Sequence, residues 1–207
     1  MANLAEFTLV AMGNSTQIEE FINISLIEQK LEAVDIFQVD LYSSPTAIET
    51  DCYTLLITGE CKWSATSALN NVFYNDYVSL EEMSVCTGVS IEVKSAEISC
   101  DFVEHFTVDN GETDEISCTS LTGLVEIPDI VDAKDPKAMD KIDKLLEIGV
   151  NGEYVGSMKL SGFDDLSKNA TDFVKTHLRN KITYPNSQNN SINSNVQAQI
   201  STQRRGR

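Results

Sequence analysis

The sequence is poor in the residues on which most catalytic and metal sites depend. It has two histidines, one tryptophan and five cysteines, and the cysteines are widely spaced with no C-x-x-C pair. That spacing argues against a disulfide framework and against a zinc site. A phosphate-binding glycine loop, a G-x-S-x-G elbow and an H-E-x-x-H motif are also absent. We therefore expect a non-enzymatic protein with reduced thiols, no metal and no cofactor.

Long apolar runs are missing as well. No stretch approaches the roughly 20 apolar residues that cross a bilayer, and the opening MANLAEFTLV has neither a basic region nor a cleavable apolar segment. These features predict no membrane contact and no secretion. With reduced cysteines, they favour a cytosolic location.

Positive charge is scarce, with 15 Lys and Arg against 32 Asp and Glu, a net charge of −17. The imbalance is uneven: residues 1–160 hold 29 acidic and 8 basic side chains, and residues 161–207 hold 3 and 7. An acidic body repels nucleic acid and membranes and suits a partner protein with a basic surface. A merely well-solvated acidic protein is the simpler interpretation of the same numbers.

The C-terminal residues differ from the rest of the chain. Residues 184–207 are rich in Asn, Gln and Ser with little apolar content, which predicts a disordered tail. Arg204, Arg205 and Arg207 could contact phosphates or a partner, although a solvating terminus explains them equally. No aromatic residues accompany them, so a base-stacking surface is not indicated.

A second candidate for partner contact is an acidic loop. Asp129, Asp132 and Asp135 recur at every third position, but the central glycine and terminal glutamate of a calcium loop are absent. We interpret these residues as a solvated acidic loop that could bind a basic partner.

Alternating apolar residues predict strands, and apolar stripes of helical spacing predict helices between them. The predicted fold is α+β: an antiparallel sheet with helices on one face in residues 1–122, then a helix-hairpin-helix extension in residues 123–183. The predicted strands cover 7–12, 37–41, 52–63, 89–94, 100–107 and 115–121, and the predicted helices begin near 16, 64, 79, 136 and 163.

Local signals mark the ends of these elements. Gly88 stands where a helix ends, and Gly59 stands where a bulge or close backbone approach is expected. Hairpin turns are predicted at Asn110-Gly111 and Asn151-Gly152. Capping boxes are predicted for Thr16 with Glu19 and for Ser79 with Glu82.

Three rarer side chains were weighed as functional candidates. His105 follows Glu104 in a strand, where neighbours point to opposite faces, so the two do not form a dyad. His177 lies on the apolar side of the last helix and is expected to pack there or to interact with the helix dipole. Trp63, beside Lys62 at a strand end, could be a stacking platform or could plug one end of the core.

A family likeness is carried by Gly59-Glu60-Cys61-Lys62-Trp63, by the strand of residues 88–93 and by the acidic link of residues 95–102. Glu104-His105-Phe106 and the Asn110-Gly111 turn complete the pattern. This layout resembles the YubB-type ferredoxin-like domain of phage, plasmid and mobile-element proteins, over roughly residues 3–120. The resemblance implies a ferredoxin-like sheet and an accessory protein, and it implies no catalytic residues. The family often has Pro-Gly where this chain has Ile98-Ser99.

Three functions remain open at this stage. The first is a phage or mobile-element accessory protein that binds another protein in the host cytoplasm; in its sharper form it mimics nucleic acid and inhibits a host defence protein. The second is a virion or assembly component whose tail becomes ordered on binding. The third is a small-molecule-binding enzyme with a cleft around Trp63 and His105.

Overall fold

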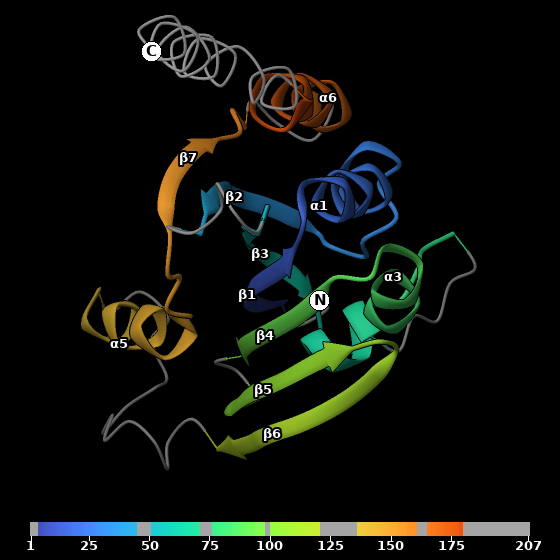
Figure 1. Ribbon diagram of the computed structural model, residues 1–207. Coiled ribbons are helices and arrows are strands. Elements are labelled where there is room, and N and C mark those ends of the chain that lie inside the picture. The colour runs from blue at the N-terminus through green and yellow to red at the C-terminus, as the bar shows by residue number, and fades with distance from the viewer. Residues whose placement is uncertain are drawn as a thin grey trace, which may run out of the picture.

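The computed structural model is built on one seven-stranded antiparallel sheet (Figure 1) with the strand order β6-β5-β4-β1-β3-β2-β7. It describes residues 4–44, 51–70, 76–97, 100–120, 136–160 and 165–179. The strands are β1 (Leu4–Gly13), β2 (Asp35–Ser43), β3 (Tyr53–Lys62), β4 (Ser90–Glu97), β5 (Phe102–Asp109), β6 (Glu112–Ser120) and β7 (Glu153–Ser157).

Helices connect and flank these strands, so the predicted α+β class is confirmed. They are α1 (Ser15–Ile22) and its π-helical continuation η1 (Asn23–Ile27), the π-helix η2 (Thr66–Asn70), α3 (Leu80–Thr87), α5 (Pro136–Leu146) and α6 (Leu166–His177). Within the described ranges, none of these helices has the length and apolarity needed to cross a membrane.

The helix ends follow local capping chemistry. The predicted box of Ser79 and Glu82 is confirmed, and Gly88 ends α3 with a left-handed φ of 72°. The predicted start of α1 at Thr16 is wrong, because Asn14 is the cap. Its side chain accepts a hydrogen bond from the Gln17 backbone at 3.0 Å, and the Gln17 side chain accepts one from the Asn14 backbone at 2.8 Å.

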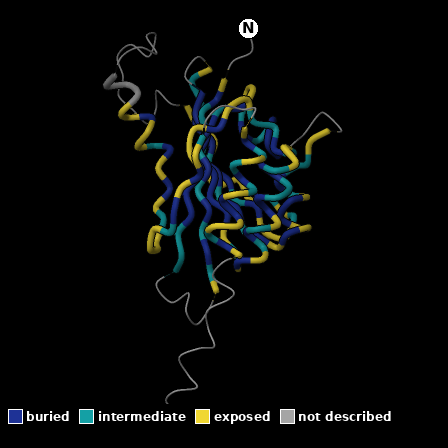
Figure 2. Tube along the Cα trace, turned by 90° about the horizontal axis from the view of Figure 1, so that it is seen from above, coloured by how far each residue is buried: buried dark blue, intermediate teal, exposed yellow. Residues whose placement is uncertain are grey.

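The main core lies between one face of the sheet and the helices α1, η1, η2, α3 and α6. Residues of one parity on each strand supply it, including Phe7 and Leu9 on β1 and Phe106 on β5, all at most 1% exposed. In Figure 2 the buried segments run through the centre of the molecule. Since each large aliphatic or aromatic side chain contributes roughly 1.5–3 kcal/mol when fully buried, this face holds the fold together.

The helix α5, which belongs to the region predicted as an extension, lies on the opposite side of the sheet from α1 and α3 (Figure 1). The physical reason is that the second face is also apolar in part. Val10 on β1 is 3% exposed, and Ile142 and Leu146 of α5 are 1% and 5% exposed. Lys94 on β4 also holds the chain directly after α5, because its Nζ donates a hydrogen bond to the Glu147 backbone carbonyl at 2.7 Å.

The predicted hairpin at Asn151-Gly152 is also wrong. Residues 153–157 form β7, which pairs antiparallel with β2 and extends the sheet by one strand. A Cβ on Gly152 would lie 2.8 Å from the Ser43 carbonyl oxygen, so close approach to β2 explains this glycine. The region predicted as an extension thus supplies an edge strand of the same sheet.

Gly59 combines a close approach with a bulge, and we expect Gly59→Ala to destabilise the protein. Gly59 pairs with Ile36, and the register shifts between Ile36 and Gln38, leaving Phe37 as the extra residue. An added Cβ would overlap the Asp35 carbonyl oxygen and contact the Phe7 ring. Because the overlapping atom is backbone, we expect a loss of about 2 kcal/mol in the free energy of unfolding, measured by urea denaturation. A change below about 0.5 kcal/mol would show that β2 yields freely.

Candidate functional site

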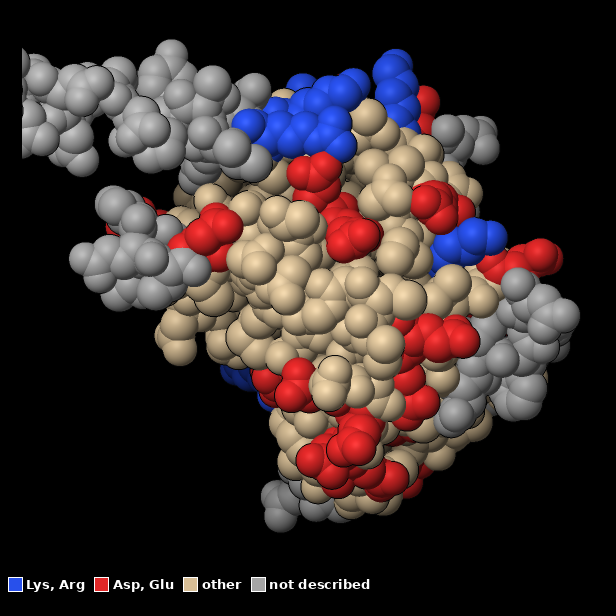
Figure 3. All heavy atoms as spheres, turned by 45° about the vertical axis from the view of Figure 1, so that its right-hand side comes forward, with Lys and Arg blue, Asp and Glu red and all other residues tan. Residues whose placement is uncertain are grey.

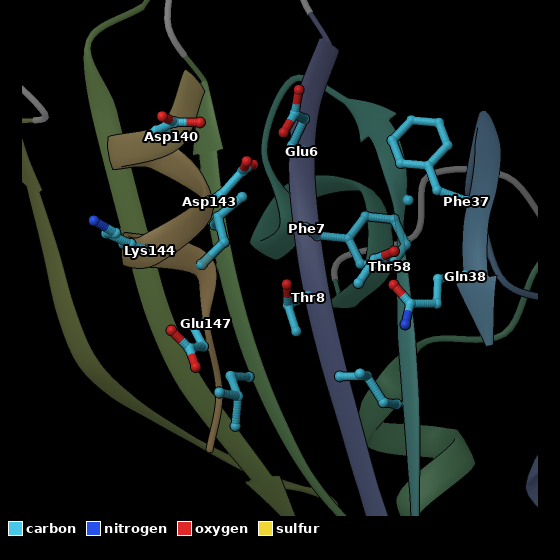
Figure 4. Close-up of a pocket in the computed structure, with 14 residues that line it drawn as sticks. Glu6, Phe7, Thr8, Phe37, Gln38, Thr58, Asp140, Asp143, Lys144 and Glu147 are labelled. Atoms are coloured by element: carbon cyan, nitrogen blue, oxygen red, sulfur yellow. The ribbon is translucent and has the colours of Figure 1, made fainter. Parts of the chain in front are cut away.

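A cleft of about 540 Å³ lies between α5 and the second face of the sheet. Its volume falls within the roughly 300–1,000 Å³ that ligand sites occupy. Figure 4 shows α5 on one side of it and strands β1, β3 and β2 on the other. It is lined by Glu6, Phe7, Thr8, Phe37, Gln38, Leu56, Thr58, Gly59, Asp140, Asp143, Lys144, Leu146, Glu147 and Ile148.

The charged residues of the cleft are mostly acidic. Glu6 comes from β1, Asp140 and Asp143 come from α5, and Glu147 directly follows α5, against a single cation in the lining, Lys144. Asp140 and Asp143 lie on one side of α5, because positions three apart share a helix face. The cleft therefore carries a surplus of negative charge on the α5 wall and at Glu6.

The opposite wall is aromatic and amide in character. Phe37, the bulged residue of β2, keeps 49% of its surface exposed, and Figure 4 shows its ring across the cleft from α5. Next to it, the Gln38 amide nitrogen donates to the Asp40 carboxylate. The amide oxygen of Gln38 thus remains as an acceptor on the cleft side.

Thr8 is the most buried polar group of the cleft lining. It is only 7% exposed, it lines the cleft, and its side chain lies between β1 and α5 in Figure 4. Among the described residues its hydroxyl has no hydrogen-bond partner. Because the hydroxyl oxygen is not one of the fully buried unpaired atoms of the described residues, it is open to the cleft and can form a hydrogen bond with a ligand there.

The acids of the cleft act on each other. The pKa of Glu6 is raised above its usual value, first by burial and then by the negative charges of Asp143 and Glu60. No described cation is placed to reverse this effect at Glu6. A ligand cation would stabilise the ionised form, which is the property expected of a cation-binding cleft.

We expect Glu6→Gln to stabilise the protein at neutral pH. Because the folded pKa of Glu6 is raised above its usual 4.5, the folded state binds the extra proton, and stability falls as pH rises from 4.5 through the folded pKa. Glutamine removes this loss. The midpoint temperature of thermal unfolding should be higher for the variant than for the natural chain at pH 7. This difference in midpoint temperature should disappear as the pH falls below 4.5. An equal difference in midpoint temperature at pH 7 and below pH 4.5 would contradict the raised pKa of Glu6.

The residues singled out in the sequence lie away from this cleft. His105 is on the same face of the sheet, where its Nε2 lies 2.8 Å from Glu92 Oε1. That partner comes from the neighbouring strand β4, whereas the Glu104 side chain bonds to Ala65 and Ser95 on the other face, so the predicted absence of a Glu104–His105 dyad is confirmed. Trp63 follows β3 and is 59% exposed, so it does not plug the core. Neither residue lines the cleft beneath α5.

One of the remaining predictions, for His177, is confirmed. The others concern residues that lie outside the described ranges. His177 packs in α6 as expected, with its ring 4.9 Å from that of Phe173 and against the backbone at Gly156. The six predicted partner-binding residues and the predicted disordered tail lie outside the described residues; the six are Asp129, Asp132, Asp135, Arg204, Arg205 and Arg207.

One signal in the sequence could have pointed to the α5 wall. Asp140 and Asp143 flank the apolar stripe of a predicted helix, and Glu147 directly follows that helix. Nothing local indicated that β1 would place Glu6 across from them, because the two segments are far apart in the chain. No group of three or more histidine, cysteine or acidic residues within the described residues is arranged to hold a metal ion.

Comparisons of the chain with protein-family models, with curated proteins and with solved structures each found no match.

Proposed function

We propose that this protein is a non-enzymatic binding protein that holds a basic segment of a partner protein in the cleft beneath α5. The observation that carries the proposal is the lining of that cleft, in which four carboxylates face one ammonium group. An exposed aromatic ring, Phe37, and apolar surface from Leu56 and Ile148 complete the lining. Acidic groups beside apolar surface suit a cationic side chain with a long apolar stem.

Electrostatics favours such a partner both at long range and within the cleft. The net charge of −17 attracts a basic protein over a distance and speeds its encounter. At the cleft itself, a cation would relieve the repulsion among Glu6, Asp143 and Glu60, which raises the pKa of Glu6. Binding should therefore weaken steeply as salt is added, since the Debye length falls to about 3 Å at 1 M.

On the side of the molecule that carries α1 and α3, the charge distribution does not favour extended mimicry of nucleic acid. Figure 3 shows the side of the molecule that carries α1 and α3, where the acidic residues form separate groups divided by uncharged surface. Lysine and arginine side chains gather at the top of that view. A mimic of a nucleic acid would need a continuous acidic stripe.

We further propose that the inner sheet is ferredoxin-like and that the protein serves a phage or mobile element in the host cytoplasm. The order β4-β1-β3-β2, with helices after β1 and after β3, supports the first part because it follows the β-α-β-β-α-β arrangement. The resemblance of residues 3–120 to YubB-type domains supports the second part. Neighbouring genes of viral or plasmid type would bear it out, and a purely chromosomal housekeeping neighbourhood would count against it.

The binding proposal is tested by capture from host lysate with matched variants. The cleft variant carries Glu6→Gln and Asp143→Asn, and the control carries Glu112→Gln and Asp114→Asn on the exposed strand β6. Both remove two charges, so nonspecific attraction falls equally. We expect basic proteins to be retained by the natural chain and the control and lost by the cleft variant. Equal retention by all three proteins would refute binding in the cleft.

A further inference from the structure

We infer that the group received by the cleft is the guanidinium of an arginine side chain, seated between the acidic wall of α5 and the ring of Phe37. This inference rests on the proposed function, and it narrows the partner from a basic segment to one that presents arginine. The argument has three independent parts: the number of acceptors, the aromatic wall and the unpaired hydroxyl of Thr8.

The acceptors of the cleft are numerous and come from different directions. Glu6 and Asp143 provide carboxylate oxygens from β1 and α5, and Thr8 and Thr58 provide hydroxyls from the sheet. The amide oxygen of Gln38 adds another, because the amide nitrogen is used by Asp40. A guanidinium carries five N–H donors in a planar fork, whereas an ammonium carries three around one point. The wider fork can engage acceptors on both walls at once.

Phe37 distinguishes the two cations further. Its ring is half exposed and stands opposite the α5 acids (Figure 4). Arginine stacks its planar, weakly hydrated group on aromatic faces, whereas lysine holds its water more tightly. The bulge that displays Phe37 is held by the close contact at Gly59, so the ring is positioned before any ligand arrives.

Thr8 supplies the observation that is not about charge. Thr8 is only 7% exposed, yet its hydroxyl oxygen is not one of the fully buried unpaired atoms of the described residues, so it is open to the cleft and can accept a hydrogen bond from a donor there. Thr8 is part of the lining of the cleft, so its hydroxyl is within reach of a ligand there. An arginine N–H reaching the sheet would pair with this hydroxyl while its other donors meet the carboxylates.

The test uses three short peptides, acetylated and amidated, that differ at one central position flanked by leucine. The position holds arginine, lysine or citrulline, the last being nearly isosteric with arginine but neutral. Affinities are measured by isothermal titration calorimetry with the full chain. We expect the arginine peptide to bind about tenfold more tightly than the lysine peptide, and the citrulline peptide to show no saturable binding.

Variants of the full chain show which residues of the cleft are responsible for the preference for arginine. Phe37→Ala should reduce the preference for arginine over lysine, and Thr8→Val should weaken arginine binding with little change in thermal stability. Asp114→Asn on β6 should leave both affinities unchanged. Equal binding of arginine and lysine peptides at the cleft would overturn the arginine inference and leave the proposed function standing. Binding of citrulline as tight as arginine, or no binding of any peptide, would overturn both.

Discussion

Replacing Glu104 with alanine is expected to lower the free energy of unfolding by about 3 kcal/mol. Glu104 is 8% exposed on the core face of β5, and its Oε2 accepts three hydrogen bonds. They come from the Ala65 backbone at 3.0 Å, the Thr66 backbone at 3.4 Å and the Ser95 hydroxyl at 2.7 Å. Alanine would leave all three donors without this acceptor in a buried place.

The size of that loss reflects the position of the carboxylate as well as its bonds. The two backbone donors stand at the beginning of η2, where N–H groups have no partner within the helix. Glu104→Gln keeps an acceptor oxygen and should lose roughly half as much. Glu112→Ala, at an exposed position of β6, is the matched control and should change stability by less than about 0.5 kcal/mol. Urea denaturation measures all three, and a Glu104→Ala loss as small as the control would contradict the role described here.

Reversing the charge at Asp143 is expected to weaken binding of a short peptide containing both lysine and arginine by about 100-fold. Asp143→Lys removes an attraction and adds a repulsion in a cleft whose other cation is Lys144. The position is exposed on α5, so the fold should tolerate the change. It should also lower the pKa of Glu6, because one of the charges that raises that pKa is removed.

The control for this variant is Asp114→Lys, which changes the net charge equally on the same face of the sheet but at its edge strand. Fluorescence anisotropy at low and at physiological salt separates the two effects. General attraction falls in both variants at low salt, and the specific loss persists only in Asp143→Lys at about 0.15 M salt. Equal losses in the two variants under both conditions would mean that the cleft has no special role.

The fold was predictable where the signals are local. An apolar run predicted the strand around Leu9, alternation predicted those around Ile57 and Val93, and the capping box at Ser79 predicted the start of α3, because these features depend on neighbours in the chain. The placement of β7 and α5 was not predictable in this way. The Asn151-Gly152 pair has the composition of a tight turn, but pairing with the free edge of β2 decided the structure of this segment.

Most of the cleft could not be predicted from the sequence, because it too depends on contacts between distant segments. Glu6 and Asp143 are brought together by the packing of α5 on the second face, and Phe37 is presented by a bulge that depends on Gly59. Only the acidic residues in and directly after α5, at positions 140, 143 and 147, had a pattern that could be found beforehand. His105 found a partner in Glu92, two residues diagonal on the adjoining strand, which requires knowledge of the register.

The most direct test of the binding proposal is to map the contact surface by nuclear magnetic resonance. The mixed lysine–arginine peptide is titrated into isotope-labelled protein, and backbone amide shifts are followed for the residues that line the cleft and for those of β6. We predict saturable shifts at Glu6, Thr8, Gln38 and Asp143, with those of β6 unchanged at about 0.15 M salt. Shifts spread over β6 and the helical face, or absent from the cleft, would contradict the account.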